Sequence, residues 1–120
     1  MIDNIRLSEK AKQQLIVIKR KTGIENWNVL CRWGLCLSLA EESIPPFEDI
    51  QTDSSVEMNW KTFSGEINQE LKTLILMRFN SEKDKSQNIG IHDFIKLHIH
   101  RGISYLFNKV NKNISDLYNW

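Results

Sequence analysis

The chain has 120 residues, of which 41% are hydrophobic and 26% are charged, and its formal net charge at pH 7 is +1. This length and composition predict one compact globular domain over residues 1–120 and exclude a disordered chain. The sequence does not begin with basic residues followed by an apolar run, which is the pattern that predicts secretion. We therefore expect a cytoplasmic protein without membrane association.

The charges are unevenly distributed along the chain. Residues 1–40 carry seven Lys or Arg against three Asp or Glu, residues 41–57 carry six acids and no base, and the rest carries nine bases against six acids. A basic N-terminal unit on a nearly neutral protein indicates a surface that binds a polyanion. We therefore divide the domain into a basic unit at 1–42, an acidic connector at 43–55 and a C-terminal part at 56–120.

The chain begins with a short apolar stretch at residues 2–7, which predicts a strand, and a helix is predicted over residues 9–22. Ser8 is a good N-cap for this helix, and Gly23 is a good terminator. The expected buried face of the helix consists of Ala11, Leu15 and Ile18.

Basic side chains in this first segment are the candidates for DNA phosphate contacts. They are Arg6, Lys10, Lys12, Lys19, Arg20 and Lys21. The alternative is that residues 19–21 only complement the negative carbonyl end of the helix on a solvated face.

A second helix is predicted over residues 27–40, WNVLCRWGLCLSLA, which has ten apolar side chains in fourteen positions and Arg32 as its only charge. A helix that is apolar nearly all round must be enclosed, and this one is too short and interrupted to span a bilayer. We therefore expect it to lie inside an oligomer. The expected interface residues are Leu30, Trp33, Gly34 and Leu37.

The glycine and the two cysteines of this helix lead to further predictions. Gly34 costs about 1 kcal/mol of helix stability, which indicates either a close approach of two backbones or a tolerated glycine. Cys31 and Cys36 are five residues apart and face different sides, so we expect buried free thiols and not a disulfide or a metal pair.

The order of strand, helix, glycine turn and apolar helix is that of a ribbon-helix-helix unit, which pairs with a second copy through its strand and second helix. The predicted fold is therefore mainly α. It has a ribbon-helix-helix-like N-terminal unit, then a short strand and two further helices, in an oligomer.

Proline ends the second helix before the acidic connector, where Glu48, Asp49 and Asp53 either mimic phosphate beside the basic helix or, as we favour, form a solvated loop. Alternation at residues 56–60 predicts a short strand. Ser64 is expected to cap a third helix, and a fourth is expected over residues 93–109 after a polar loop at 80–88. The expected buried residues of the third helix are Ile67, Leu71, Leu74 and Ile75.

No phosphate-binding glycine loop, zinc-protease motif or nucleophile elbow is present, so the sequence predicts neither enzymatic chemistry nor a cofactor. The best candidates for a metal site are His98 and His100, with His92. On a helix the first two diverge, whereas on a strand they share a face. We favour core or surface histidines and expect no metal.

Three segments carry a family resemblance: LSEKAKQQLIVIKRKTGIENWNVLCRWGLCLSLAE, VEMNWKTFSGE and LHIHRGISYL. They resemble the DndE family of bacterial DNA sulfur modification proteins. The resemblance implies a ribbon-helix-helix-like homotetramer that binds nicked double-stranded DNA in a phosphorothioation system. The sulfur chemistry belongs to its companions, a cysteine desulfurase and an ATP-using sulfur transferase, alongside an SMC-like ATPase. Gly34 stands where related sequences often have alanine.

The predicted function is a non-catalytic DNA-binding accessory subunit with low sequence specificity, because phosphate contacts carry no base information. One alternative is a ribbon-helix-helix transcriptional repressor that reads bases through Asn4 and Arg6. The other is a scaffold for the sulfur transferase and the ATPase, with no role for the basic surface.

Overall fold

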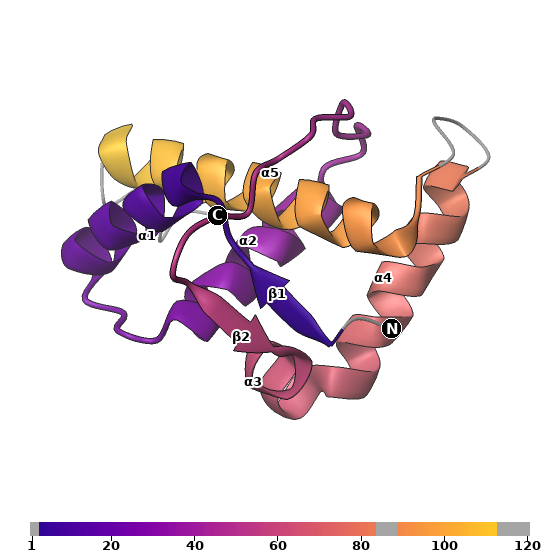
Figure 1. Ribbon diagram of the computed structural model, residues 1–120, viewed down its shortest axis with the longest axis horizontal. Helices are drawn as coiled ribbons and strands as arrows, with labels where there is room; N and C mark the ends of the chain where they lie inside the picture. The colour runs from indigo at the N-terminus through magenta and orange to yellow at the C-terminus, as the bar shows by residue number, and fades with distance from the viewer. Residues whose placement is uncertain (1–2, 84–88, 113–120) are drawn as a thin grey trace.

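The structure is a computed structural model that describes residues 3–83 and 89–112. It is mainly helical, with one small antiparallel sheet (Figure 1). The elements in chain order are β1 (Asn4–Arg6), α1 (Glu9–Thr22), α2 (Trp27–Ala40), β2 (Glu57–Asn59), α3 (Trp60–Ser64), the 3-10 helix η1 (Gly65–Ile67), α4 (Asn68–Lys83) and α5 (Ile91–Lys112).

Helix α1 has the predicted bounds and the predicted caps. The side chain of Ser8 accepts a hydrogen bond from the backbone N–H of Ala11 at 3.1 Å. Gly23, at a φ of 76°, ends the helix and donates its N–H to the Lys19 carbonyl. Ala11 is buried together with Leu15 and Ile18, so the predicted apolar face is confirmed.

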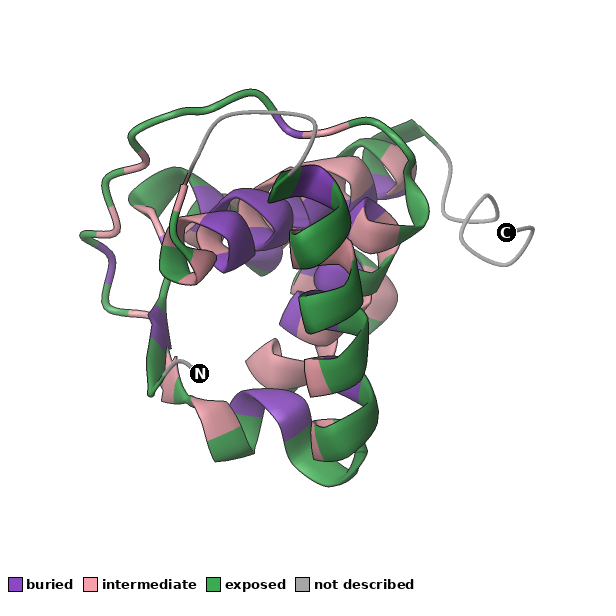
Figure 2. Cartoon of the chain, turned by 90° about the vertical axis from the view of Figure 1, so that its right-hand side faces the viewer, coloured by how far each residue is buried: buried purple, intermediate pink, exposed green. Residues whose placement is uncertain are grey.

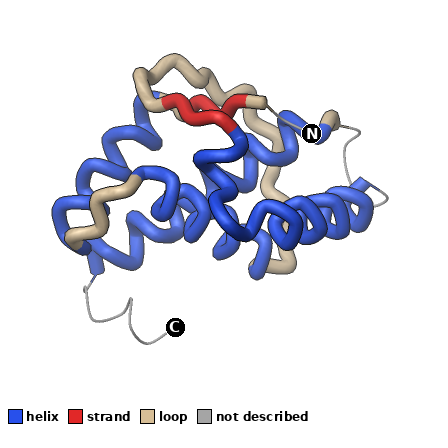
Figure 3. The backbone as a smooth tube through the Cα atoms, turned by 90° about the horizontal axis from the view of Figure 1, so that it is seen from below, coloured by secondary structure: helices blue, strands red, loops and turns tan. Residues whose placement is uncertain are grey.

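Strand β1 pairs with β2 of the same chain (Figure 3). In this pairing Arg6 lies opposite Glu57. The sequence had predicted a ribbon shared by two copies, whereas this ribbon forms within one chain. Strand β2 stops before Trp60 because the Asn59 side chain accepts from the Thr62 N–H at 2.7 Å and starts α3.

Helix α5 runs along the molecule, with α1 beside its C-terminal half and α4 near its N-terminal end (Figure 1). It crosses α2 where two glycines meet. A Cβ on Gly34 would lie 3.0 Å from the Ile103 nitrogen and 3.1 Å from the Gly102 carbonyl carbon. The predicted backbone approach at Gly34 therefore exists, but its partner is α5 of the same chain.

The burial of α2 also differs from the prediction. Leu30 and Gly34 are buried within the single chain, so they offer no surface to a second copy. Cys31 is buried as predicted, whereas Cys36 is exposed.

The third predicted helix is corrected in its start and its phase. Ser64 ends α3, and α4 begins at Asn68. Leu71 and Ile75 are buried as predicted, but Ile67 and Leu74 are 43% and 51% exposed. Because each residue advances a helix by about 100°, a buried face centred on Leu71 and Ile75 turns Leu74 outward. Figure 2 shows exposed positions along the outer side of this helix.

Two other predicted segments lie partly outside the described residues. The predicted polar loop at 80–88 is helical as far as Lys83, and its remainder, 84–88, is outside them, as is the segment 113–120. The fourth predicted helix is confirmed as α5 and is longer at both ends. Within residues 3–83 and 89–112, no helix is both long and apolar enough to cross a bilayer.

Candidate nucleic-acid interface

The predicted cations of α1 do not share one face. Lys12 and Lys19, about two turns apart, lie on the side of β2 and the start of α2. The ammonium of Lys12 donates to the Ser55 hydroxyl at 2.9 Å, and that of Lys19 lies 5.4 Å from the ring centre of Trp27. The groove between them also contains Glu25 and Glu57, so its net charge is small.

The other cations of α1 point elsewhere. Lys10 lies in a second groove, which faces the middle of α5. The ammonium of Lys21 donates to the Asn111 side-chain oxygen on α5 at 2.8 Å. Arg20 is exposed between the two sides. The sequence therefore identified the cations correctly as surface residues, but it did not show that they divide between two sides.

The last turns of α1 and α5 lie next to each other, as the hydrogen bond from Lys21 to Asn111 shows. We call this end of the molecule, where the two last turns are adjacent, the basic end. It consists of Lys19, Arg20, Lys21, Lys109 and Lys112. Cations here stabilise the partial negative charges of the helix C-termini. Arg20, Lys21 and Lys112 are also exposed, so a phosphate backbone can approach them. Sequence reasoning missed the contribution of α5.

Arg6 is in a different electrostatic environment. Its guanidinium donates to the Glu57 carboxylate across the ribbon at 2.7 Å. Exposed pairs of this kind contribute at most about 1 kcal/mol, so the pair does little for stability. The carboxylate nevertheless repels phosphate, which makes Arg6 a weaker candidate for a DNA contact than the cations of the basic end.

A buried chain of polar side chains connects α2, α4 and α5. The Ser38 hydroxyl lies 2.7 Å from Nδ1 of His98, and Nε2 of His98 lies 2.8 Å from a Glu82 carboxylate oxygen. Arg101 donates to the Ser38 hydroxyl, so that hydroxyl donates its own hydrogen to His98, whose Nε2–H then faces Glu82. Burial lowers the pKa of His98 and favours the neutral ring that this arrangement requires.

This chain of contacts has the composition of a hydrolase triad but not its accessibility. Ser38 and His98 are completely buried, and a catalytic nucleophile must reach its substrate. The three side chains therefore serve as a structural tie between helices. Sequence reasoning missed the tie because Glu82 is distant in the chain from both partners.

Two arginines hold the C-terminal end of α2. The guanidinium of Arg78 donates to the carbonyls of Leu39 and Glu41, each at 2.7 Å, and Arg101 donates to the Ser38 carbonyl at 2.8 Å. The last carbonyls of a helix lack partners within the helix. A glycine just after a helix often allows the backbone to satisfy these carbonyls. No glycine follows Ala40, and this was the sequence signal that side chains must provide the partners.

The other histidines have separate roles. Nε2 of His100 accepts from the Ser8 N–H at 3.1 Å, its Nδ1 donates to the Lys96 carbonyl, and burial lowers its pKa. His92 is exposed. Across the part of the chain that the structure describes, no three His, Cys, Asp or Glu side chains are grouped to hold a metal. Burial raises the pKa of the Cys31 thiol to about 12.

These features define a class: a small, mainly helical protein with a two-stranded ribbon and a basic end made from two helices. The chain belongs to the DndE family, because the family described as DNA sulphur modification protein DndE matches residues 4–114. The resemblance noted in the sequence is thereby confirmed.

Two solved structures are similar to this chain. DndE from Escherichia coli B7A, involved in DNA phosphorothioation modification, is 22% identical with a TM-score of 0.70, over 88% of this chain and 98% of that chain. A mutant DndE involved in DNA phosphorothioation is 18% identical with a TM-score of 0.65, over 90% and 99%. No curated protein sequence matches this chain. The likeness shows that the chain has the DndE fold.

Proposed function

We propose that this chain is a non-catalytic accessory subunit of a bacterial DNA phosphorothioation system that binds double-stranded DNA, with a preference for nicked duplexes. The observation that carries the proposal is the basic end, where the last turns of two adjacent helices contribute five cations. Membership of a DNA sulphur modification family supports DNA as the polyanion. Other subunits of the system, the sulfur transferase and the ATPase, would act with it.

Low sequence specificity follows from the chemistry of this surface. Lysines and arginines at helix ends contact phosphates, which position a protein on DNA without reading bases. A repressor of the ribbon-helix-helix type would read bases through Asn4 and Arg6, but Arg6 is paired with Glu57 on the ribbon. A carboxylate at that position disfavours the repressor alternative.

Removing the exposed cations of the basic end should weaken DNA binding strongly. We expect the Arg20→Ala, Lys21→Ala, Lys112→Ala triple variant to bind unrelated duplexes about equally poorly. The slope of log affinity against log salt should fall by roughly 0.9 for each phosphate that the variant no longer neutralises. Gel-shift titrations over a salt series, with intact and nicked duplexes, measure both quantities. The wild type should bind the nicked duplex more tightly.

A matched control removes three bases from α3 and α4. The Lys61→Ala, Lys72→Ala, Lys83→Ala variant has the same net charge as the first and should keep wild-type affinity and slope. Equal weakening in both variants would show that only net charge matters. A weakening on one DNA sequence alone would support the repressor, and no binding at low salt would support the scaffold.

We further propose that the protein is a homotetramer whose copies meet on the outer side of α2. Trp33 and Leu37 from the predicted interface are only partly buried in the single chain. On the same side Cys36 and Ala40 are exposed. An apolar, nearly uncharged helix side of this kind is typical of an oligomer interface.

A cation placed on that side should separate the copies without unfolding them. Cys36→Lys changes an exposed position, so the single chain should keep its fold, whereas burying an ammonium between copies costs several kcal/mol. Light scattering should then give a smaller mass than for the wild type. Asn80→Lys, on the exposed side of α4, is the control. An unchanged mass for Cys36→Lys would exclude this interface.

A further inference from the structure

A groove of about 510 Å³ lies between α1, the start of α2 and strand β2. Its volume is within the range of about 300–1,000 Å³ that is usual for sites of small ligands. Lys19 belongs both to this groove and to the basic end. A DNA strand held at the basic end can therefore place one of its nucleotides in the groove.

An aromatic ring lines this groove. Trp27, the first residue of α2, is partly buried, and the Lys19 ammonium lies over its ring, 5.4 Å from the ring centre. A surface cation–π contact of this kind is weak, whereas a nucleobase stacks more strongly on an aromatic ring. The lysine side chain is flexible, so a base can displace the ammonium from the ring. The displaced ammonium can then contact a phosphate of the same strand.

Two amide side chains lie beside the ring. Asn28 donates its amide nitrogen to the Thr62 carbonyl at 3.2 Å, which holds this side chain at the wall of the groove. Asn26 also lines the groove; it is exposed, and its side chain does not cap α2. An amide offers both a donor and an acceptor, and the edge of a nucleobase presents the same kinds of group. The groove therefore combines a stacking surface with hydrogen-bonding groups.

The charges of the groove are nearly balanced. Two lysines, Lys12 and Lys19, and two glutamates, Glu25 and Glu57, line it. Balanced charge of this kind does not select a free phosphate or a free cation. It suits a ligand whose recognised part is neutral and whose charged parts lie outside the groove. A nucleobase is such a part, when the neighbouring phosphates of its strand lie at the basic end.

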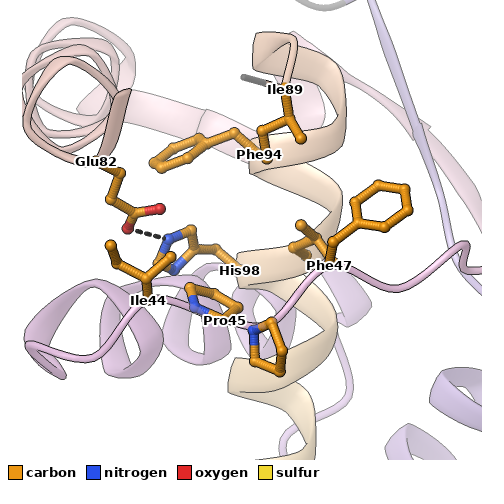
Figure 4. Close-up of a pocket in the computed structure, with 9 residues that line it drawn as sticks. Ile44, Pro45, Phe47, Glu82, Ile89, Phe94 and His98 are labelled. Carbon is orange, nitrogen blue, oxygen red and sulfur yellow. Dashed lines mark hydrogen bonds and ion pairs between the residues drawn. The ribbon is translucent and has the colours of Figure 1, made fainter. Parts of the chain in front are cut away.

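A second cavity, of about 270 Å³, lacks these features (Figure 4). It lies between connector residues 44–47 and α5. Its polar side chains are Glu82 and His98, and they are bonded to each other at 2.8 Å. Among the described residues that line it, none is a lysine or an arginine. A nucleotide there would have no cation for its phosphate, so the groove at Trp27 is the better site.

We propose that the groove at Trp27 takes an unpaired nucleobase of a DNA strand whose phosphates lie at the basic end. The base would stack on Trp27, with its edge at Asn26 and Asn28. This inference rests on the proposed DNA binding and extends it. Taking a base out of an intact duplex costs pairing and stacking energy, and this cost is lowest for a base that is already unpaired. The groove would therefore distinguish an interrupted strand from an intact one.

Two nicked duplexes test this site. One carries a single unpaired adenine nucleotide as a flap at the nick, and the other carries the same flap without its base. In gel-shift titrations the wild-type protein should bind the first duplex about tenfold more tightly, because only its flap can stack on the ring. The readout is the ratio of the two affinities, so the phosphate contacts that both probes share cancel.

Substitutions of Trp27 assign this preference to the ring. Trp27→Leu should lower the affinity ratio to about one, and Trp27→Phe should retain most of it, since phenylalanine also stacks on bases. Trp60→Leu is the matched control, because Trp60 is also partly buried but donates its Nε1–H to Asn68, and the residues that line the groove do not include it. Circular dichroism verifies the fold of each variant.

The outcomes separate this inference from the proposed function. A wild-type affinity ratio near one would overturn the inference, and this comparison needs no substitution. Equal effects of Trp27→Leu and Trp60→Leu on the ratio would also overturn it. Salt-sensitive binding of both probes with a ratio near one would leave the proposed DNA binding intact. Failure to bind either probe at low salt would contradict the DNA binding itself, and this inference with it.

Discussion

Gly102→Ala should destabilise this protein severely, by roughly 4 kcal/mol. At the crossing of α2 and α5, a Cβ on Gly102 would overlap the carbonyl carbon and oxygen of Gly34 and lie 2.9 Å from its Cα. These are backbone atoms of a helix, so they cannot rotate aside as a flexible side chain would. The two helices must separate, and the buried side chains along their crossing then pack less closely.

Urea unfolding followed by circular dichroism measures this destabilisation. Gly34→Ala is the graded comparison and should cost less, because its Cβ would come no closer than 3.0 Å to the Ile103 nitrogen and 3.1 Å to the Gly102 carbonyl carbon. Gly90→Ala is the control, since no atom of the described residues beyond its chain neighbours lies within 4 Å of its Cβ. Alanine is intrinsically better than glycine inside a helix by about 1 kcal/mol, so any destabilisation at Gly102 reflects the crossing itself. Equal stability of the Gly102 and Gly90 variants would contradict this account.

Arg78→Ala should have an effect of similar size, about 3–5 kcal/mol. The side chain is only 17% exposed, and its Nε pairs with the Glu82 carboxylate at 2.8 Å. Its other nitrogens donate to the carbonyls at the end of α2. Truncation leaves a buried carboxylate without its guanidinium and leaves helix carbonyls without donors.

Thermal and urea unfolding of three variants test this expectation. Arg78→Lys keeps the charge but cannot reproduce the planar fork, so it should restore only part of the stability. Adding Glu82→Gln to Arg78→Ala should recover part of the stability, because it removes the buried charge that has lost its guanidinium. Arg6→Ala, which breaks the exposed pair with Glu57, should cost less than about 1 kcal/mol. If Arg78→Ala lowers the free energy of unfolding no more than Arg6→Ala does, the contacts of Arg78 with Glu82 and with the end of α2 are not important for stability.

The amino-acid sequence by itself determined the local elements. Ser8 and Gly23 specify the start and end of α1 by hydrogen bonds within a few residues, and the predicted range 9–22 is that of the structure. Proline after α2 and the alternation at residues 56–60 predicted the connector and β2 in the same way, although Trp60 itself begins α3. Such signals depend only on residues that are neighbours in the chain, so they can be recognised in the sequence alone.

The limits of prediction appear where a helix contacts distant parts of the chain. Apolar content showed that α2 must be covered, but not that α5 covers it at Gly34. The pattern at Ile67 and Leu74 predicted buried side chains, whereas both are exposed: Ile67 lies in η1, before α4 begins, and the phase of α4 turns Leu74 outward. In the candidate interface, the cations were visible in the sequence, but their division between two sides of α1 was not.

Only the tertiary structure decided which distant groups meet. It gave β1 a partner within the chain, placed Glu82 against His98, and brought the last turns of α1 and α5 into one basic end. The physical reason is that contacts between residues far apart in the chain depend on how whole elements pack. Helical periodicity and capping act within one or two turns and specify which residues need a partner, but the packing of the complete chain selects that partner.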